Sequence, residues 1–206
     1  MKIMNNNIGV YIIDSEGFIN LRENHSEIWD NFLKQIAVLR WGYDENNLDS
    51  RINTLKNNLL DFTSFITFAE KEQRVSQNNK SLAYNNVIGF AYFCQDENDE
   101  KQWYYGGLAV HAKYRRLGIF RRLVIHRHKQ TGQLITYIHP QIAESMIEMA
   151  MLELKSRKAS KLFTYIEKDN KSSILLHKKF GFIPSENQEN INGFEKNNRI
   201  VYEYIV

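Results

Sequence analysis

The 206-residue sequence predicts a single α/β domain comprising residues 1–206, with helices packed against a central sheet. Two periodicities lead to this prediction. Short alternating or continuously apolar runs predict strands, and longer runs with apolar residues three and four apart predict amphipathic helices. The hydrophobic content of 43% is typical of a globular chain of this length, which can bury a sizeable core.

The strand predictions come from short apolar runs bounded by polar residues. They cover residues 8–13, 64–69, 87–94, 102–110, 161–166 and 200–206. The paired glycines Gly106 and Gly107 interrupt the strand at 102–110. Glycines inside a strand indicate a bulge or the close approach of another backbone, so we expect an irregularity there.

The helix predictions cover residues 26–41 and 49–62, and the polar stretch 70–86 is interpreted as a loop. The segment between 121 and 161 is longer than one helix and a short loop require. We expect a helix to about Lys129, a turn at residues 131–132, an apolar piece at 134–138 and a second helix opened by Pro140. A further helix follows residue 170 and ends at Gly181.

A basic turn follows the strand at 102–110. The segment from Leu108 to Phe120 ends a strand, passes through Arg115 and Arg116, and reaches Gly118, where a helix is expected to open. Backbone N–H groups at a helix start converge on one point and carry the positive end of the helix dipole. Because cations there are unfavourable for the helix itself, the pattern favours a bound phosphate or pyrophosphate; the alternative is a solvated basic face.

This segment resembles the acyl-CoA-binding signature of the GNAT superfamily of N-acyltransferases. In that family a strand ending in Leu-x-Val is followed by Arg/Gln-x-x-Gly-x-Gly/Ala. Arg115, Gly118 and Phe120 occupy the three signature positions, and Phe120 departs from the small residue expected. Phenylalanine still offers a backbone N–H, so we interpret it as a variant of the signature.

A second segment resembles the family motif Asn-x-x-Ala/Ser-x-x-Leu-Tyr-x-x-x-Gly-Phe. The positions that match are Asn170, Ser173, Leu176, Gly181 and Phe182. His177 stands where the family often has tyrosine. Two motifs in the right order are more specific than either alone.

The resemblance implies the GNAT-type fold, a mixed and mostly antiparallel sheet flanked by helices, here with a helical insertion before the fifth strand. It implies transfer of an acetyl group from acetyl-CoA, as the acyl-donor co-substrate, to a primary amine of a small molecule. The residues expected to bind the cofactor are Leu108, Ala109, Val110, Arg115, Arg116, Leu117, Gly118, Ile119, Phe120, Arg121, Asn170 and Ser173. In the family, main-chain groups of the bulged strand bond the pantetheine amides, and Leu108 and Val110 would supply them.

The chemistry requires one group that takes a proton from the amine and one that protonates the leaving thiolate. His177 is the candidate acid, because an imidazole with a reference pKa of about 6.5 titrates near neutral pH; the alternative is a surface histidine beside two lysines. Many family members place a glutamate where this chain has Tyr104. A phenol with a reference pKa of about 10 is not a convincing base, although Tyr104 could hold a water in a relay. The sequence does not identify the base.

Two further hypotheses stay open. One keeps the chemistry but makes the acceptor a macromolecule, either a protein amine or an aminoacyl-tRNA, and the other is a binding module that senses acyl-CoA without turnover. The net charge of +3 is modest, which argues against dedicated nucleic-acid binding. We expect no metal, because His126 and His128 point to different sides of a helix.

We also expect no membrane association and a monomer or homodimer. No apolar run reaches the length of a membrane span. The single cysteine, Cys94, excludes an internal disulfide and is compatible with a cytoplasmic location.

Replacement of Gly118 by glutamate is expected to abolish acetyl-CoA binding. The substitution adds bulk and negative charge at the point where the phosphates are expected to approach the backbone. Calorimetric titration of the variant checks this, with thermal melting to establish that it folds. Retained affinity would show that the basic turn is not the phosphate site.

Overall fold

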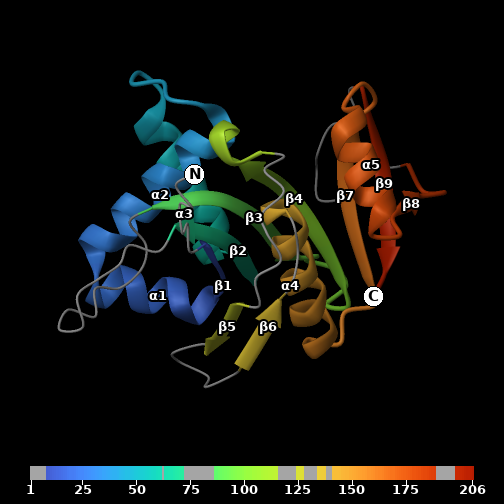
Figure 1. Cartoon of the computed structure of the whole chain (residues 1–206), viewed down its shortest axis with the longest axis horizontal. Helices are drawn as coiled ribbons and strands as arrows, with labels where there is room; N and C mark the ends of the chain where they lie inside the picture. Colours follow the sequence, from blue (N-terminus) through green and yellow to red (C-terminus); the bar gives the residue numbers. More distant parts are fainter. Residues whose placement is uncertain are drawn as a thin grey trace, which may run out of the picture.

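The computed structural model describes residues 8–61, 63–71, 86–115, 124–127, 134–137, 141–188 and 198–206. Seven strands form one sheet in the order β1-β2-β3-β4-β7-β9-β8 (Figure 1). Their bounds are β1 (Ile8–Asp14), β2 (Ser64–Lys71), β3 (Val87–Gln95), β4 (Gln102–Val110), β7 (Lys161–Glu167), β8 (Ile183–Pro184) and β9 (Arg199–Ile205). Only the pair β4–β7 is parallel in this sheet, which confirms the predicted mixed, mostly antiparallel arrangement.

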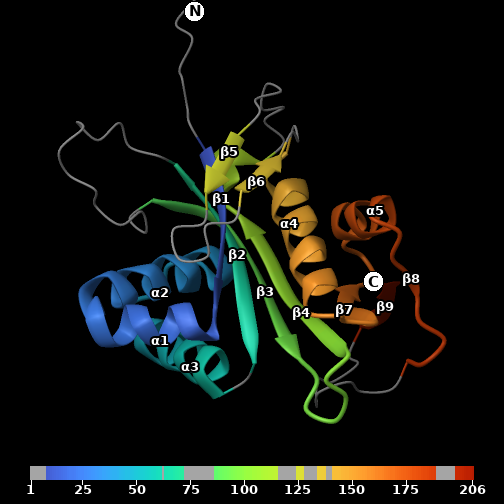
Figure 2. The ribbon, with the colours of Figure 1, turned by 90° about the horizontal axis from the view of Figure 1, so that it is seen from below.

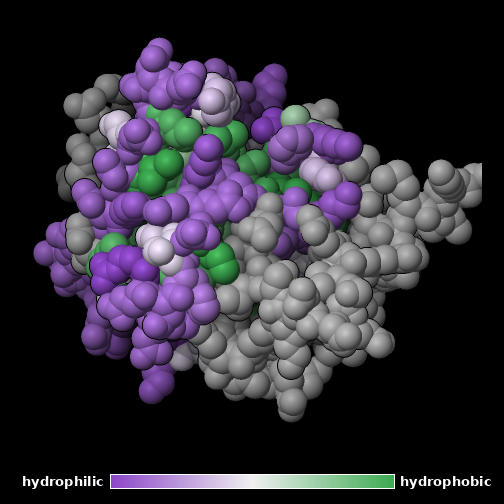
Figure 3. Space-filling view, turned by 90° about the vertical axis from the view of Figure 1, so that its left-hand side faces the viewer, coloured by the Kyte–Doolittle hydropathy of each residue, from purple (hydrophilic) through white to green (hydrophobic). Residues whose placement is uncertain are grey.

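Helices cover both faces of the sheet (Figures 1 and 2). One face carries α1 (Ser15–Asn24), α2 (Ser26–Trp41) and α3 (Leu48–Asp61), and the other carries α4 (Ile142–Ser156) and α5 (Lys171–Lys179). Figure 3 shows hydrophilic side chains over much of the outer surface on the side of α1, α2 and α3, as expected for helices that bury one apolar stripe. Among the described residues, no helix is long and apolar enough to cross a membrane.

The alternation of side chains along the strands divides the buried apolar residues of the described part of the chain into clusters, of which the two largest lie on opposite faces of the sheet. The core under α1–α3 includes Trp29 and Phe32 from α2 together with Tyr92 and Tyr104 from the sheet. The core under α4 and α5 includes Phe65, Phe93, Trp103, Tyr105 and Ile147. Consecutive residues of β4 therefore belong to different cores, so Tyr104 and Tyr105 lie on opposite faces.

Most predicted elements are confirmed, and some differ. Helix α2 has the predicted bounds, and β2 extends two residues into the predicted loop at 70–86, of which 72–85 lie outside the described residues. Helix α1 was not predicted; its N-cap is Asp14, whose side chain accepts a hydrogen bond from the N–H of Gly17 at 3.0 Å.

The segment between β4 and β7 differs most from the prediction. The helix expected to reach about Lys129 is wrong at residues 124–127, where β5 (Val124–Arg127) pairs with β6 (Leu134–Tyr137) as a separate antiparallel ribbon. Both segments contain β-branched residues, which favour strand pairing over a helix. The second expected helix is α4, and its predicted stripe (Ile142, Met146, Ile147, Ala150 and Leu154) is buried.

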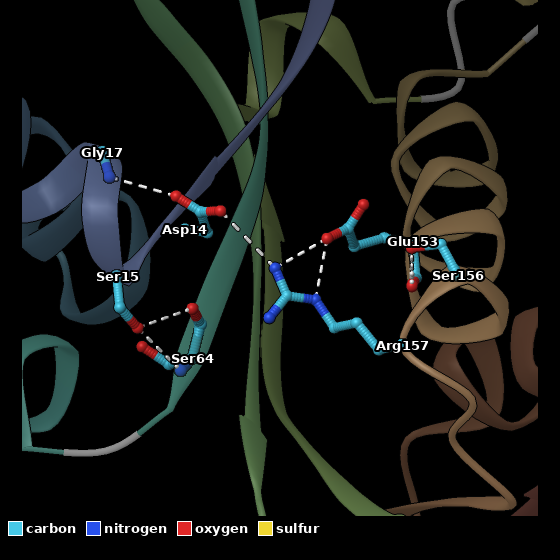
Figure 4. Close-up of polar contacts among 7 residues, drawn as sticks. All are labelled: Asp14, Ser15, Gly17, Ser64, Glu153, Ser156 and Arg157. Atoms are coloured by element: carbon cyan, nitrogen blue, oxygen red, sulfur yellow. Dashed lines mark hydrogen bonds and ion pairs between the residues drawn. The ribbon is translucent and has the colours of Figure 1, made fainter. Parts of the chain in front are cut away.

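Arg157, just beyond α4, ties this helix to the opposite side of the sheet (Figure 4). One terminal nitrogen lies 2.6 Å from a carboxylate oxygen of Glu153 and 3.6 Å from one of Asp14. The guanidinium carbon lies 5.3 Å from the ring centroid of Phe65 and 5.5 Å from that of Trp103. Arg157 thus links the end of β1 to α4 and covers aromatic residues of the core.

Replacement of Arg157 by alanine is expected to lower the free energy of unfolding by about 1 kcal/mol, because a partly exposed ion pair and the packing on two rings are lost. The Arg22→Ala variant is the matched control, since Arg22 contacts only Glu23 among the described residues, in an exposed pair. Urea denaturation measures the free energy of unfolding of both variants and of the wild type. Equal stability of the two variants would contradict this role for Arg157.

Candidate functional site

The strands β4 and β7 are paired along only part of their length. The parallel register joins residues Gln102 to Tyr105 with Lys161 to Thr164. Beyond this point no pairing is found, although β4 continues to Val110 and β7 to Glu167. Figure 1 shows the two strands diverging from the end at which they pair. We call this region, residues 106–110 of β4 and 165–167 of β7, the splay.

A bulge in β4 begins the splay. Tyr92 of β3 pairs with Gly107 and Phe93 pairs with Tyr105, so Gly106 is an extra residue without a partner in β3. A Cβ at Gly106 would lie 2.7 Å from the ring of Tyr92, and Gly107 has a φ of 156°. Both positions therefore require glycine, and the irregularity predicted from the glycine pair is confirmed.

The register of β3 with β4 determines which main-chain groups face the splay. The N–H of His111 donates to the carbonyl of Ile88 at 2.8 Å. Because successive residues of an antiparallel strand alternate in direction, the main-chain groups of Ala109 also face β3, whereas those of Leu108 and Val110 face away from it. The carbonyl of Val110 already has a partner in the protein, because it accepts a hydrogen bond from Nε of Arg115 at 2.7 Å.

The predicted phosphate-binding turn is described only at its start. Arg116, Leu117, Gly118, Ile119, Phe120 and Arg121 lie outside the described residues. A single 3₁₀ turn, Ala112–Tyr114, precedes Arg115, which is exposed. The first described helix after β4 is α4, which begins at Ile142. Within the described part of the chain, no three His, Cys, Asp or Glu residues are arranged to hold a metal ion.

The second motif forms the start of α5. Asn170 is the N-cap residue, and its side-chain oxygen accepts a hydrogen bond from the N–H of Ser173 at 3.1 Å. Gly181 follows the helix with a φ of 88°. The hydroxyl of Ser173 lies 3.3 Å from Nδ1 of His177. Asn170 and Ser173 therefore shape α5, and Ser173 also contacts the candidate catalytic histidine.

His177 is buried, with 3% of its surface exposed, so it is not the surface histidine of the alternative interpretation. Its Nδ1 lies 2.7 Å from the carbonyl oxygen of Ser173. Since a carbonyl only accepts, Nδ1 carries the proton and Nε2 carries the lone pair. Nε2 is buried and has no hydrogen-bond partner among the described residues. The ring packs against Tyr105 and Phe182, with centroid distances of 5.3 and 5.0 Å.

Burial lowers the pKa of His177, and the hydrogen bond to Ser173 opposes this shift. The imidazole is therefore neutral at neutral pH. A neutral ring with an unpartnered Nε2 accepts a proton before it can deliver one, which changes the order of events expected for a simple acid.

Tyr104 lies on the opposite face of β4 from His177. Its ring is buried in the core under α1–α3 and contacts Tyr165 at a centroid distance of 5.8 Å. Burial raises the pKa of Tyr104, so the phenol is neutral and does not serve as a base. The structure thus places the two predicted catalytic residues on different faces of the sheet, close to where β4 and β7 part.

Two residues near the splay were not predicted. Nη2 of Arg40, at the end of α2, donates to the carbonyl of Gly106 at 3.3 Å. Tyr105, whose ring packs against that of His177, has a buried hydroxyl without a hydrogen-bond partner among the described residues. No sequence signal identifies Arg40, because an arginine in the last turn of a helix is commonly explained by the helix dipole.

Comparison with known proteins agrees with this geometry. Residues 32–132 match the model of the Acetyltransferase (GNAT) family. This range includes the bulged strand β4. No curated protein sequence matches the chain.

Solved structures of similar fold cover nearly the whole chain. An acetyltransferase of the GNAT family from Staphylococcus aureus Mu50 has a TM-score of 0.55 at 12% identity and covers 96% of this chain and 99% of that chain. The NatC complex bound to Gag peptide and CoA has a TM-score of 0.53 at 17% identity and covers 97% of this chain and 99% of that chain. The ribosomal-protein-S18-alanine N-acetyltransferase from Escherichia coli has a TM-score of 0.51 at 12% identity and covers 97% of this chain and 94% of that chain.

Burial of His177 is expected to make stability depend on pH. In the unfolded chain the ring titrates near its ordinary pKa of about 6.5, and in the folded chain its pKa is lower. The unfolded chain therefore binds protons more readily, so the contribution of the neutral ring is present above about pH 6.5 and decreases as the pH falls below it.

Urea denaturation at about pH 8 and about pH 5 checks this. The wild type and a Lys178→Gln control are expected to lose more stability on acidification than His177→Gln, because Lys178 is exposed whereas the ring of His177 is buried. An equal loss in all three proteins would contradict the assignment.

Proposed function

We propose that this chain, which belongs to the GNAT family of acetyltransferases, transfers the acetyl group of acetyl-CoA to the primary amine of a small molecule. The observation that carries the proposal is the splay, where the polar main-chain edge of β4 loses its pairing with β7. A strand edge of this kind accepts an extended ligand that carries amide groups, because both offer alternating N–H and C=O groups.

The residues at the splay fit acetyl-CoA as the donor. The N–H and C=O of Leu108 and the N–H of Val110 lie on the edge of β4 that faces away from β3, which suits the amides of the pantetheine arm. Nε2 of His177 and the hydroxyl of Tyr105 are buried polar atoms that lack protein partners among the described residues, as expected beside a ligand site. The exposed Arg115, with the basic turn that follows it, is proposed to bind the phosphates.

Acetyl-CoA supplies an activated acetyl thioester, and the chain supplies position and proton transfer. A main-chain N–H of the bulged strand is proposed to donate to the thioester carbonyl and to stabilise negative charge that develops on its oxygen. The main-chain edge fixes the donor in one orientation, which lowers the entropic cost of attack.

His177 is proposed to transfer the proton from the amine to the leaving thiolate. Because its ring is neutral and Nε2 carries the lone pair, Nε2 first accepts the proton that the attacking nitrogen loses. The imidazolium then returns this proton to the sulfur, and the ring is neutral again. One proton leaves the nitrogen and one reaches the sulfur, so a single residue serves as base and then as acid.

Tyr104 is proposed to act on the side of α2, where the acceptor would enter. As a neutral phenol it donates one hydrogen bond and accepts another, so it can hold a water or the acceptor amine. Its burial next to Tyr165 restricts the space and favours a small acceptor.

A protein N-terminus is the second candidate acceptor. Two of the similar structures are a complex bound to a peptide and a ribosomal-protein-alanine N-acetyltransferase. A thin, extended chain end would satisfy the same restriction of space. A cytoplasmic location, inferred from the single cysteine, stays a prediction.

The test of function is the release of CoA thiol from acetyl-CoA in the presence of small primary amines or of peptides with free N-termini. Mass spectrometry of the products identifies the acetylated nitrogen. Turnover with small amines above the rate with peptides is the expected result. Turnover with peptides alone would replace the small-molecule acceptor by the second candidate, and acetyl-CoA binding without turnover on either class would indicate a sensing module.

Replacement of His177 by glutamine is expected to lower kcat by about a hundredfold, as is typical for the loss of general acid–base catalysis, with little change in the Kd for acetyl-CoA. Initial rates and calorimetric titration measure the two quantities. The exposed neighbour gives the control variant Lys178→Gln, which is expected to match the wild type. Unchanged kcat in His177→Gln would remove His177 from the mechanism.

A further inference from the structure

Arg40 places a positive charge at the splay on the face of the sheet that α2 covers. It is the penultimate residue of α2, and its Nη2 donates to the carbonyl of Gly106, the extra residue of the bulge, at 3.3 Å. Its guanidinium carbon lies 4.7 Å from the ring centroid of Trp41. The side chain is thus held between its own helix and the strand that is proposed to bind the donor.

Among the described residues, the titratable groups that interact electrostatically with Arg40 are neutral. These groups are Tyr104, Tyr92 and Cys94. Burial raises the pKa of both tyrosines, and it raises the pKa of the Cys94 thiol to about 11. All three therefore carry no charge at neutral pH, whereas an arginine keeps its charge at any pH a protein survives.

The charge of Arg40 has no carboxylate partner within the described part of the chain. The ion pairs found there involve other cations, and the hydrogen-bond acceptor of Arg40 is an uncharged carbonyl. Burial also lowers the pKa of Arg40, a sign that its charge is partly removed from water. A partly buried cation in neutral surroundings is stabilised by an anion that enters its site.

A second arginine, Arg199, also acts electrostatically on Tyr104. Arg199 lies at the start of β9. Its charge and that of Arg40 both lower the pKa of the Tyr104 phenol, although burial, which raises this pKa, has the larger effect. Nη2 of Arg199 lies 3.6 Å from Oε1 of Glu167 in an exposed pair, so its charge is partly balanced, whereas Arg40 has no carboxylate partner in the part of the chain that the structure describes.

We infer that the acceptor is an amine that carries a carboxylate near its amino group, as an amino acid does, and that Arg40 binds this carboxylate. The inference rests on the proposed function. Of the three guanidinium nitrogens of Arg40, Nη2 is the one with a hydrogen-bond partner among the described residues. The N–H groups on Nη1 and Nε are therefore left to donate to carboxylate oxygens. The positive charge also disfavours polyamines and other polycations, which require acidic side chains at the site.

The experiment compares matched acceptors that differ only at the carboxyl group. The proteinogenic L-amino acids are supplied as one mixture, their carboxamides as a second and peptides with free N-termini as a third, each with acetyl-CoA. Mass spectrometry identifies the acetylated products, and kcat/KM is then measured for the best amino acid and its carboxamide. The enzymes are the wild type, Arg40→Met, Arg40→Lys and the control Arg22→Met, which replaces an exposed arginine of α1.

The wild type and Arg22→Met are expected to prefer the acid over the carboxamide by about tenfold or more, the effect of a hydrogen bond to a charged group. Arg40→Met is expected to lose most of this preference, mainly through KM for the acid, and Arg40→Lys to keep part of it because the charge remains. The retained rate of Arg40→Met on the carboxamide shows that the variant folds.

Acetylation of carboxamides or peptides as fast as of acids would overturn the carboxylate site while leaving the transferase function intact. An unchanged preference in Arg40→Met would show that another group binds the carboxylate. If the wild type acetylates other small primary amines but none of the three mixtures, the carboxylate site is wrong and the transferase function stands. If it acetylates no amine of any class, the proposed function fails, and this inference fails with it.

Discussion

The parting of two parallel strands is the constraint on which the site depends. β4 and β7 form hydrogen-bonded pairs only as far as Tyr105 and Thr164, and the main chain of β4 beyond that point needs other partners. The bulge at Gly106 begins this separation, because an extra residue bends a strand and increases its twist. The same bulge is where Arg40 reaches β4 from one face, while His177 contacts the residue before it, Tyr105, from the other.

The rest of the fold holds this opening in place. The hydroxyl of Thr164 donates to the carbonyl of Tyr105 at 3.1 Å, at the last paired position between the two strands. Two aromatic cores on opposite faces fix the paired ends of the strands, and Arg157 joins α4 to the end of β1 across the sheet. Lys179 of α5 lies 2.7 Å from the buried carboxylate of Glu144 in α4, which links the two helices on the face of His177.

Local patterns were enough to predict much of this arrangement. The apolar stripe of α2, the glycine pair of β4 and the spacing from Asn170 to Gly181 each depend on residues close in sequence, and each is confirmed. The ribbon β5–β6 was missed because a short run such as Val124–Arg127 adopts either helix or strand according to its partner. The burial of His177 was equally hidden, since the two lysines that follow it suggest a surface position and only the packing of α5 on β4 decides.

Hydrogen exchange of individual backbone amides of β4 shows whether the parted edge of this strand binds acetyl-CoA. Acetyl-CoA is expected to slow exchange at the N–H groups of Leu108 and Val110, which face the splay, and to leave exchange at the N–H of Ala109, which faces β3, nearly unchanged. Unaltered exchange at Leu108 and Val110 under saturating acetyl-CoA would contradict the claim that the parted edge of β4 binds the donor.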